Sequence, residues 1–372
     1  MAAGEGRDLR IDFFRGLALV MIFINHVPGN MFEVLTSRNF GLSDATEIFV
    51  FLAGYAAALA YGRGIAERGM VAGGWRAAVR AGQLYRAHIL STVAAIVVIA
   101  FAAWRVADPA YYEWINLAPI FFNTGPALVG LFTLGHQPGY FNILPLYMVL
   151  LLFMPVLFAL LLRSPVLMLG VSVALYLAVN LLRLNLPHYP TTDTWFLNPF
   201  AWQLLFAIGL TLGWRAKRGM PTVPLRPRWA ALAGGFLLVC LAAVLADWQH
   251  LPVTGAFSFL VVPDKSYLSV PRLLHFLALA YVVAALTVGA RWLGSVLARP
   301  MIVMGQQALA VFCVGSVLAI MAQVVRFEAE GEVFVDSLLI GCGILAQVLV
   351  AEYLAWRKIT ARRVLPGAVA VR

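Results

Sequence analysis

Long runs of hydrophobic residues recur along the chain, separated by short polar segments. Each run is close to the roughly 20 residues that a helix needs to cross the hydrocarbon core of a bilayer. The runs lack the alternation of a membrane β-barrel, and helices satisfy their own backbone hydrogen bonds in lipid. The pattern therefore predicts ten transmembrane helices, near residues 11–29, 46–61, 86–104, 141–162, 165–182, 196–214, 229–247, 269–289, 301–321 and 334–356.

One further apolar segment, residues 118–135, is not counted among these spans. Asn123, Gly125 and Pro126 interrupt it, and an additional crossing would reverse the orientation of every later loop. We expect an interfacial or re-entrant segment on the outer side of the membrane. The predicted fold is an all-α integral membrane protein, with one polytopic domain over residues 1–372.

Composition and charge agree with this prediction. Hydrophobic residues make up 62% of the chain and charged residues 12%, whereas soluble domains contain about 25% charged residues. If the N-terminus is cytoplasmic, most of the 27 lysines and arginines fall in inner loops and most of the 17 acids in outer ones. This asymmetry is typical of membrane topology and predicts that both termini are cytoplasmic. The net charge of +10 then requires no nucleic-acid partner.

The first predicted span carries polar residues on one face. On a helix with 100° per residue, Arg15 and His26 differ by about 20° in direction, and Asp12 lies within about 40° of His26. The ordinary interpretation of Arg15 is a lipid anchor, and that of His26 is a residue that packs at the end of a helix. The shared face favours a reaction path, because a neutral imidazole can take a proton from a hydroxyl near pH 7. Asn25, beside His26, is a candidate oxyanion donor.

Residues 10–30, RIDFFRGLALVMIFINHVPGN, contain Arg15 and His26 at the R-x10-H spacing of the membrane acyltransferase type 3 superfamily. Residues 37–63, 83–90 and 137–156 extend the match, and together these blocks resemble the OpgC family within that superfamily. Two features depart from the superfamily pattern: Ala53 precedes Gly54 where Ser-Gly is usual, and residues 142–150 contain no acid.

This resemblance implies O-acylation, typically succinylation, of periplasmic glucans in the bacterial inner membrane. It implies His26 as catalytic base, Arg15 in donor handling, and an acyl-CoA, succinyl-CoA in the usual case, as co-substrate. No permanently bound cofactor is expected. The expected partners are the acyl-CoA, the glycan acceptor and the lipid bilayer, and a glucan synthase is a further candidate. Direct transfer and an acyl-histidine relay both stay open.

Other polar residues are candidates for the same site. Asp44 and Glu47 have the spacing of a capping box at a helix start, and either could also orient His26. Arg86 and His88, in a predicted span, are candidates for donor binding. Arg272 and His275 lie one turn apart in the eighth predicted span, where an arginine requires a partner. A salt bridge from Arg272 to Asp44, Glu47 or Asp264 is the ordinary alternative to contact with an acyl carboxylate.

Two outer histidines complete the set of candidates. His136 is a candidate for acceptor contact, whereas His188 is expected to be solvated. The chain contains three cysteines, which are too few and too deep in predicted spans for a zinc site, so no metal is expected.

Two functions of other classes compete with acyl transfer. Ten helices with intramembrane arginine and histidine would also suit a transporter or flippase for an envelope glycan or a lipid-linked intermediate. The chain shows no paired, interrupted spans that would mark an inverted repeat. A non-catalytic subunit of a glycan synthase is the third possibility, and it would tolerate loss of His26.

Overall fold

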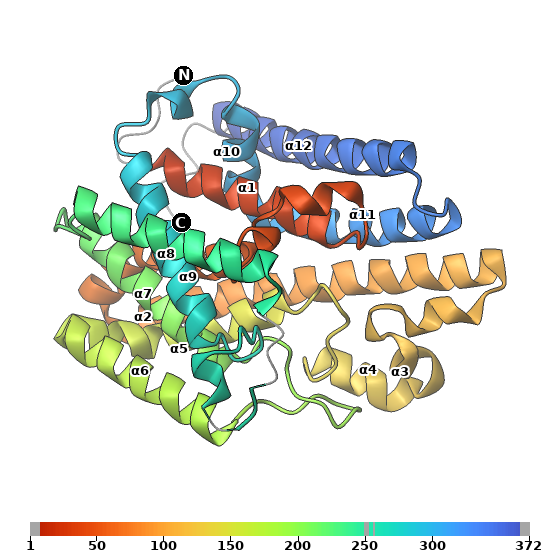
Figure 1. The fold of residues 1–372 in the computed structure, drawn as a ribbon, viewed down its shortest axis with the longest axis horizontal. Helices are drawn as coiled ribbons and strands as arrows, with labels where there is room; N and C mark the ends of the chain where they lie inside the picture. Colours follow the sequence, from red (N-terminus) through yellow and green to blue (C-terminus); the bar gives the residue numbers. More distant parts are fainter. Residues whose placement is uncertain (1–7, 249–252, 256, 365–372) are drawn as a thin grey trace. The chain divides into compact units, whose positions relative to one another are not determined.

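The computed structural model describes residues 8–248, 253–255 and 257–364. Regular structure in these ranges is helical, and β structure is limited to an isolated bridge between Pro187 and Thr194. The chain divides into two compact units, one of residues 1–34 with 289–372 and the other of residues 35–288. The predicted all-α class is therefore confirmed for the described residues (Figure 1).

The first unit joins the two ends of the chain. Its helices are α1 (Leu9–Asn25), η6 (Arg291–Gly294), α10 (Arg299–Gln306), α11 (Ala308–Glu328) and α12 (Val333–Val364), and η1 (Met31–Leu35) begins at its edge.

The second unit holds the other helices of the described residues. They are η2 (Ser37–Asn39), α2 (Ala45–Val106), η3 (Pro109–Asn116), α3 (Ala118–Phe122), α4 (Thr124–Phe132), α5 (Ile143–Arg163), α6 (Pro165–Leu182), α7 (Pro199–Lys217), α8 (Pro227–Leu245), η5 (Ser258–Leu260) and α9 (Val270–Leu286).

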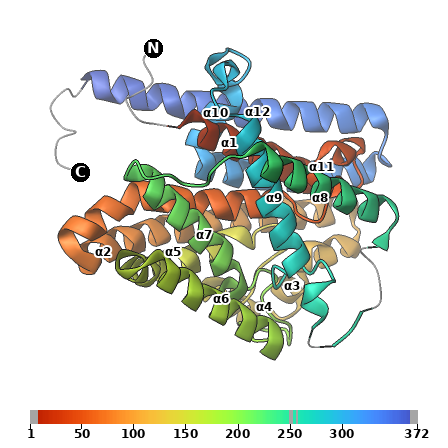
Figure 2. The same ribbon diagram turned by 60° about the vertical axis from the view of Figure 1, so that its left-hand side comes forward.

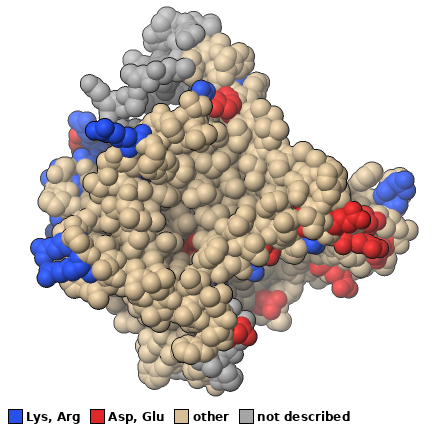
Figure 3. All heavy atoms as spheres, turned by 45° about the horizontal axis from the view of Figure 1, so that its top comes forward, with Lys and Arg blue, Asp and Glu red and all other residues tan. Residues whose placement is uncertain are grey.

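Among the described residues, six helices are long and apolar enough to cross a membrane, namely α2, α5, α6, α8, α11 and α12. Many large apolar side chains on them are exposed, as lipid-facing residues must be. Uncharged residues cover most of the face seen in Figure 3, with charged residues gathered toward its edges. The protein is therefore a multi-pass membrane protein. The count of ten spans and the cytoplasmic position of both termini stay predictions.

The element α2 contains two of the predicted spans, 46–61 and 86–104, as two helical halves joined at a kink. Gly69 separates them with a backbone φ of 82°, a left-handed value that glycine adopts without strain. The helix bends so sharply there that a Cβ on Gly73 would lie 2.0 Å from Cγ1 of Ile65. The bend lies in the orange part of the ribbon in Figure 2. The predicted spans thus lie on opposite sides of one glycine.

The structure differs from the predicted helix boundaries in one other place. Residues 301–321 do not form one helix, because α10 ends at Gln306 and α11 starts at Ala308, with Gln307 at φ −108° and ψ 26° between them. Hydrophobicity alone could not detect this break, since apolar residues flank it on both sides. Residues 118–135 form α3 and α4, broken at Asn123, and neither is long enough to cross a bilayer.

In the second unit, α2 and α7 cross at close range through glycines. A Cβ on Gly54 would lie 2.1 Å from the carbonyl oxygen of Phe206, and one on Gly209 would lie 2.2 Å from that of Phe51. Small residues at such crossings let helix backbones approach in membranes, where contact and not the hydrophobic effect drives association. Gly54 therefore has a structural function, in the dipeptide where Ala53 replaces the usual serine of the superfamily pattern.

We expect Gly54→Ala to lower the free energy of unfolding by about 1–3 kcal/mol, because the added methyl group forces α2 and α7 apart. Unfolding in mixed micelles, followed by tryptophan fluorescence, measures the change. Gly170→Ala in α6 is the matched control, since no atom lies within 4 Å of its added Cβ. Equal behaviour of the two variants would contradict the crossing described above.

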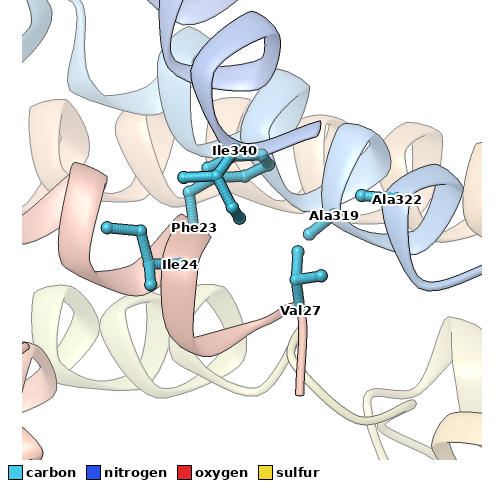
Figure 4. Packing of buried hydrophobic residues seen from close by; sticks show 6 residues of the cluster. All are labelled: Phe23, Ile24, Val27, Ala319, Ala322 and Ile340. Atoms are coloured by element: carbon cyan, nitrogen blue, oxygen red, sulfur yellow. The ribbon is translucent and has the colours of Figure 1, made fainter. Parts of the chain in front are cut away.

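In the first unit, α1 crosses α10 in the same way. A Cβ on Gly16 would lie 1.9 Å from the carbonyl oxygen of Met301, and one on Gly305 would lie 1.8 Å from that of Asp12. At the other end of α1, a hydrophobic cluster joins α1 to α11 and α12 (Figure 4). Its buried members are Phe23, Ile24, Val27, Ala319, Ala322 and Ile340. These contacts hold both ends of α1.

Candidate functional site

Helix α1 carries the four candidates of the first predicted span. It begins after Asp8, whose carboxylate accepts from the backbone N–H of Arg10 at 3.0 Å, and ends at Asn25. His26 is the cap residue, and its N–H donates to the carbonyl of Ile22 at 3.0 Å. Because the helix is continuous, Arg15 lies about 16 Å along the axis from His26.

Asp12 lies at the crossing of α1 and α10. Its side chain is 2% exposed, and its Oδ2 atom accepts a long hydrogen bond of 3.4 Å from Nε2 of Gln306. Its backbone carbonyl faces Gly305. Asp12 therefore takes part in helix packing, and its assignment to donor binding stays a prediction.

The turn after His26 receives three side chains that the sequence analysis did not single out. Gln323 donates from Nε2 to the carbonyl of His26 at 2.5 Å, and Arg326 donates from Nη2 to the carbonyl of Gly29 at 2.5 Å. Asp336 accepts from Nε of Arg326 at 2.8 Å. The spacing of Gln323 and Arg326, three residues apart in an apolar helix, is the signal that could have drawn attention to them.

The second unit confirms the capping box at the start of α2. The carboxylate of Asp44 accepts from the N–H of Thr46 at 2.8 Å, and Oε2 of Glu47 accepts from the N–H of Asp44 at 2.9 Å. Two backbone N–H groups that a helix start leaves free are thereby satisfied. The predicted helix start is correct to within one residue.

The other carboxylate oxygens of the capping box bind cationic side chains. The salt bridge from Arg272, predicted as the alternative to contact with an acyl carboxylate, is therefore present. Arg272 donates from Nε to Oε1 of Glu47 at 2.7 Å and from Nη2 to Oδ2 of Asp44 at 3.2 Å. Lys265 donates to the same oxygen of Asp44 at 2.6 Å. Burial would raise the pKa of Asp44, but Lys265 and Arg272 outweigh it and hold that pKa well below its usual range. Two acids and two bases thus form a charge-balanced cluster.

His275 lies one turn after Arg272 and extends this cluster. Its Nδ1 atom lies 2.7 Å from Oγ of Ser43, and both side chains are buried. A Cβ on Gly41 would lie 1.9 Å from Nε2 of His275, so the loop before α2 packs closely on this ring. The predicted residues Asp44, Glu47, Arg272 and His275 are therefore brought together, and their contacts fix the start of α2 to α9.

Arg86 and His88 do not share an environment. Arg86 is exposed, whereas His88 is completely buried in the second half of α2. Residues two positions apart in a helix point in directions about 200° apart, which accounts for the difference. Neither ring nitrogen of His88 has a hydrogen-bond partner among the described residues. The two residues therefore cannot bind one donor group from the same side of α2.

His136 contacts His188, which corrects the expectation that His188 is solvated. The two rings lie 5.1 Å apart in an edge-to-face arrangement, and His188 is 8% exposed. Nε2 of His188 accepts from the N–H of Gln137, and Nδ1 lies 2.8 Å from the hydroxyl of Thr191. Burial, with His188 nearby, lowers the pKa of His136 to about 4. Loop folding buried His188, and this depends on contacts that no local pattern reveals.

Among the described residues, no group of three or more His, Cys, Asp or Glu side chains is placed so that it could hold a metal ion. Eight of the candidates fall into two sets: Asp12, Arg15, Asn25 and His26 in the first unit, and the cluster of Asp44, Glu47, Arg272 and His275 in the second, whereas Arg86, His88 and His136 lie outside that cluster. The individual roles in binding and catalysis stay predictions.

Residues 7–359 match the family described as OpgC protein. Neither a curated protein nor a solved structure matches the chain. The matched region contains both sets of candidate residues and nearly every described helix. Because the match extends over almost the whole chain, the protein belongs to the OpgC family.

Proposed function

We propose that this protein is a membrane O-acyltransferase that moves an acyl group, with succinyl as the first candidate, from a cytoplasmic acyl-CoA to a hydroxyl of a periplasmic glucan or another envelope glycan. The match to the OpgC family over residues 7–359 carries the proposal, because that family name points to a glucan-modifying membrane acyltransferase in general. The multi-pass helical fold supports it, since donor and acceptor on opposite sides require a protein that spans the membrane.

In the proposed reaction, His26 acts as general base. Its imidazole takes the proton of a glycan hydroxyl while that oxygen attacks the carbonyl carbon of the thioester. The carbon–sulfur bond then breaks, the CoA thiolate leaves, and the imidazolium returns the proton to it. An ester on the glycan and free CoA are the products, so no oxidant or further reactant is needed.

The remaining candidates take supporting roles in this proposal. Asn25, or a backbone N–H near it, stabilises the oxyanion of the tetrahedral intermediate, an interaction that can supply about 3 kcal/mol. Arg15 and Asp12, closer to the cytoplasmic end of α1, handle the donor. Glu47 and Asp44 act through the cluster that they form with Arg272 and Lys265. His136 contacts the acceptor, and Arg86 binds CoA phosphate from its exposed position.

The experiment that tests the function compares periplasmic glycans from a deletion strain, with and without the wild-type protein, by mass spectrometry. We expect an acyl mass increment to disappear on deletion and to return with the wild-type protein, and the size of the increment identifies the acyl group. Matched membrane levels, measured by immunoblot, are the control. If the glycans do not change on deletion, the glycan acceptor is wrong, and transport of an envelope intermediate becomes the better explanation.

A further inference from the structure

The end of α1 exposes backbone carbonyls that the helix itself cannot satisfy. The last turn of a helix lacks N–H donors for its carbonyls, and lipid supplies none. Here Gln323 donates to the carbonyl of His26 and Arg326 donates to the carbonyl of Gly29, each at 2.5 Å. Both donors come from one face of α11, three residues apart. Helix α11 therefore supplies donors to the carbonyl of the proposed catalytic residue and to a carbonyl in the turn that follows it.

Asp336 of α12 closes this arrangement. Its Oδ1 atom accepts from Nε of Arg326 at 2.8 Å, and its Oδ2 atom accepts from the N–H of Met31 at 3.2 Å. The Asp336 side chain is 3% exposed and that of Arg326 is 22% exposed. The ion pair thus binds the turn at two groups: Arg326 binds the carbonyl of Gly29, and Asp336 binds the N–H of Met31. The segment from Gly29 to Met31 is therefore bound at both of its ends.

Two glycines make room for the guanidinium of Arg326. Gly29 has a φ of 78°, and a Cβ there would lie 3.1 Å from Nη1 of Arg326. Gly331 has a φ of 72°, and a Cβ there would lie 2.8 Å from Nη2. Larger residues would be strained in both backbone conformations and would crowd the guanidinium. The local backbone is therefore shaped around Arg326.

We propose that Gln323, Arg326 and Asp336 form a clamp that positions His26 for acyl transfer. This inference rests on the proposed function, in which His26 is the base. The three side chains bind the backbone at and after His26, so they are positioning residues and not catalytic ones. A base must lie within hydrogen-bond reach of the proton that it removes, and a misplacement of about 1 Å can cost about 100-fold in rate.

The test uses the full-length protein in lipid nanodiscs, with succinyl-CoA or acetyl-CoA as donor, periplasmic glucan as acceptor, and released CoA thiol as the measured product. Gln323→Leu removes the donor to His26 at similar volume, and Asp336→Asn weakens the hold on Arg326 without a change in shape. We expect kcat to fall about 10-fold to 100-fold in each, with unchanged KM for the acyl-CoA. Ser337→Ala is the matched control, because its hydroxyl donates to the Val333 carbonyl of its own helix.

A double mutant separates positioning from general damage. In a His26→Gln background, Gln323→Leu should cause no further loss of the residual rate, since the base that it positions is already gone. An equal loss in both backgrounds, or a wild-type kcat in both Gln323→Leu and Asp336→Asn, overturns the clamp alone. Should Gln323→Leu fail to fold, Asp336→Asn provides the same comparison. A fully active His26→Gln protein overturns His26 as general base and the clamp with it, whereas a wild-type protein that releases no thiol overturns the proposed function.

Discussion

Replacement of His26 by glutamine is expected to lower acyl transfer by about 10²-fold to 10⁴-fold, the usual contribution of a general base. Glutamine has a similar size and can hydrogen-bond, but it cannot accept the hydroxyl proton. The carbonyl of residue 26 still accepts from Gln323, and the cluster of Phe23, Ile24 and Val27 is untouched, so the fold should persist. The rate of thiol release from acyl-CoA, with purified protein in nanodiscs, measures the loss.

Two controls accompany this measurement. The melting temperature of His26→Gln should match that of the wild-type protein, and His26→Ala should regain part of its activity when imidazole is added to the assay. Recovery with imidazole would assign the lost function to proton transfer and not to packing. A wild-type rate in His26→Gln would show that His26 is structural and would exclude the proposed mechanism.

Replacement of Arg272 by methionine is expected to produce the largest loss of stability, about 3–5 kcal/mol. Arg272 binds both Glu47 and Asp44, and its removal leaves two buried carboxylates with Lys265 as the remaining cation of the cluster. Glu47 is completely buried, so water cannot compensate. Unfolding in mixed micelles measures the difference.

The double variant Glu47→Gln with Arg272→Met gives the sharper comparison. Removal of both charges avoids an unpaired carboxylate, so the double variant should be more stable than Arg272→Met alone. Arg63→Met is the matched control, because Arg63 pairs with Glu67 at 2.7 Å on an exposed surface where ion pairs contribute little. If Arg272→Met is no less stable than Arg63→Met, the cluster does not hold α9 to the start of α2.

The hydrophobic runs along the chain were sufficient to predict the helical class and the positions of most helices. The capping box at Asp44 and Glu47 was also predictable, because a cap depends on residues three apart in sequence. The shared face of Arg15 and His26 follows from helical geometry alone. Each of these features is local, so the neighbouring residues contain the necessary information.

Features that join distant residues depend on packing instead. The break at Gln307 separates two packed helices, and the close crossing of Gly54 with Phe206 joins residues far apart in sequence. His188 was expected to be solvated, but a loop folds it against His136. The pairing of Arg272 with Glu47 was one of several alternatives until α9 was seen to pack on the start of α2.

The clamp around His26 illustrates the same limit most clearly. Gln323, Arg326 and Asp336 lie about 300 residues after the turn that they bind. Local periodicity places a polar residue on a helix face, but only the packing of α1, α11 and α12 decides which backbone group that residue meets. Hydrogen bonds act over about 3 Å, and such proximity between distant segments arises only from the folded chain.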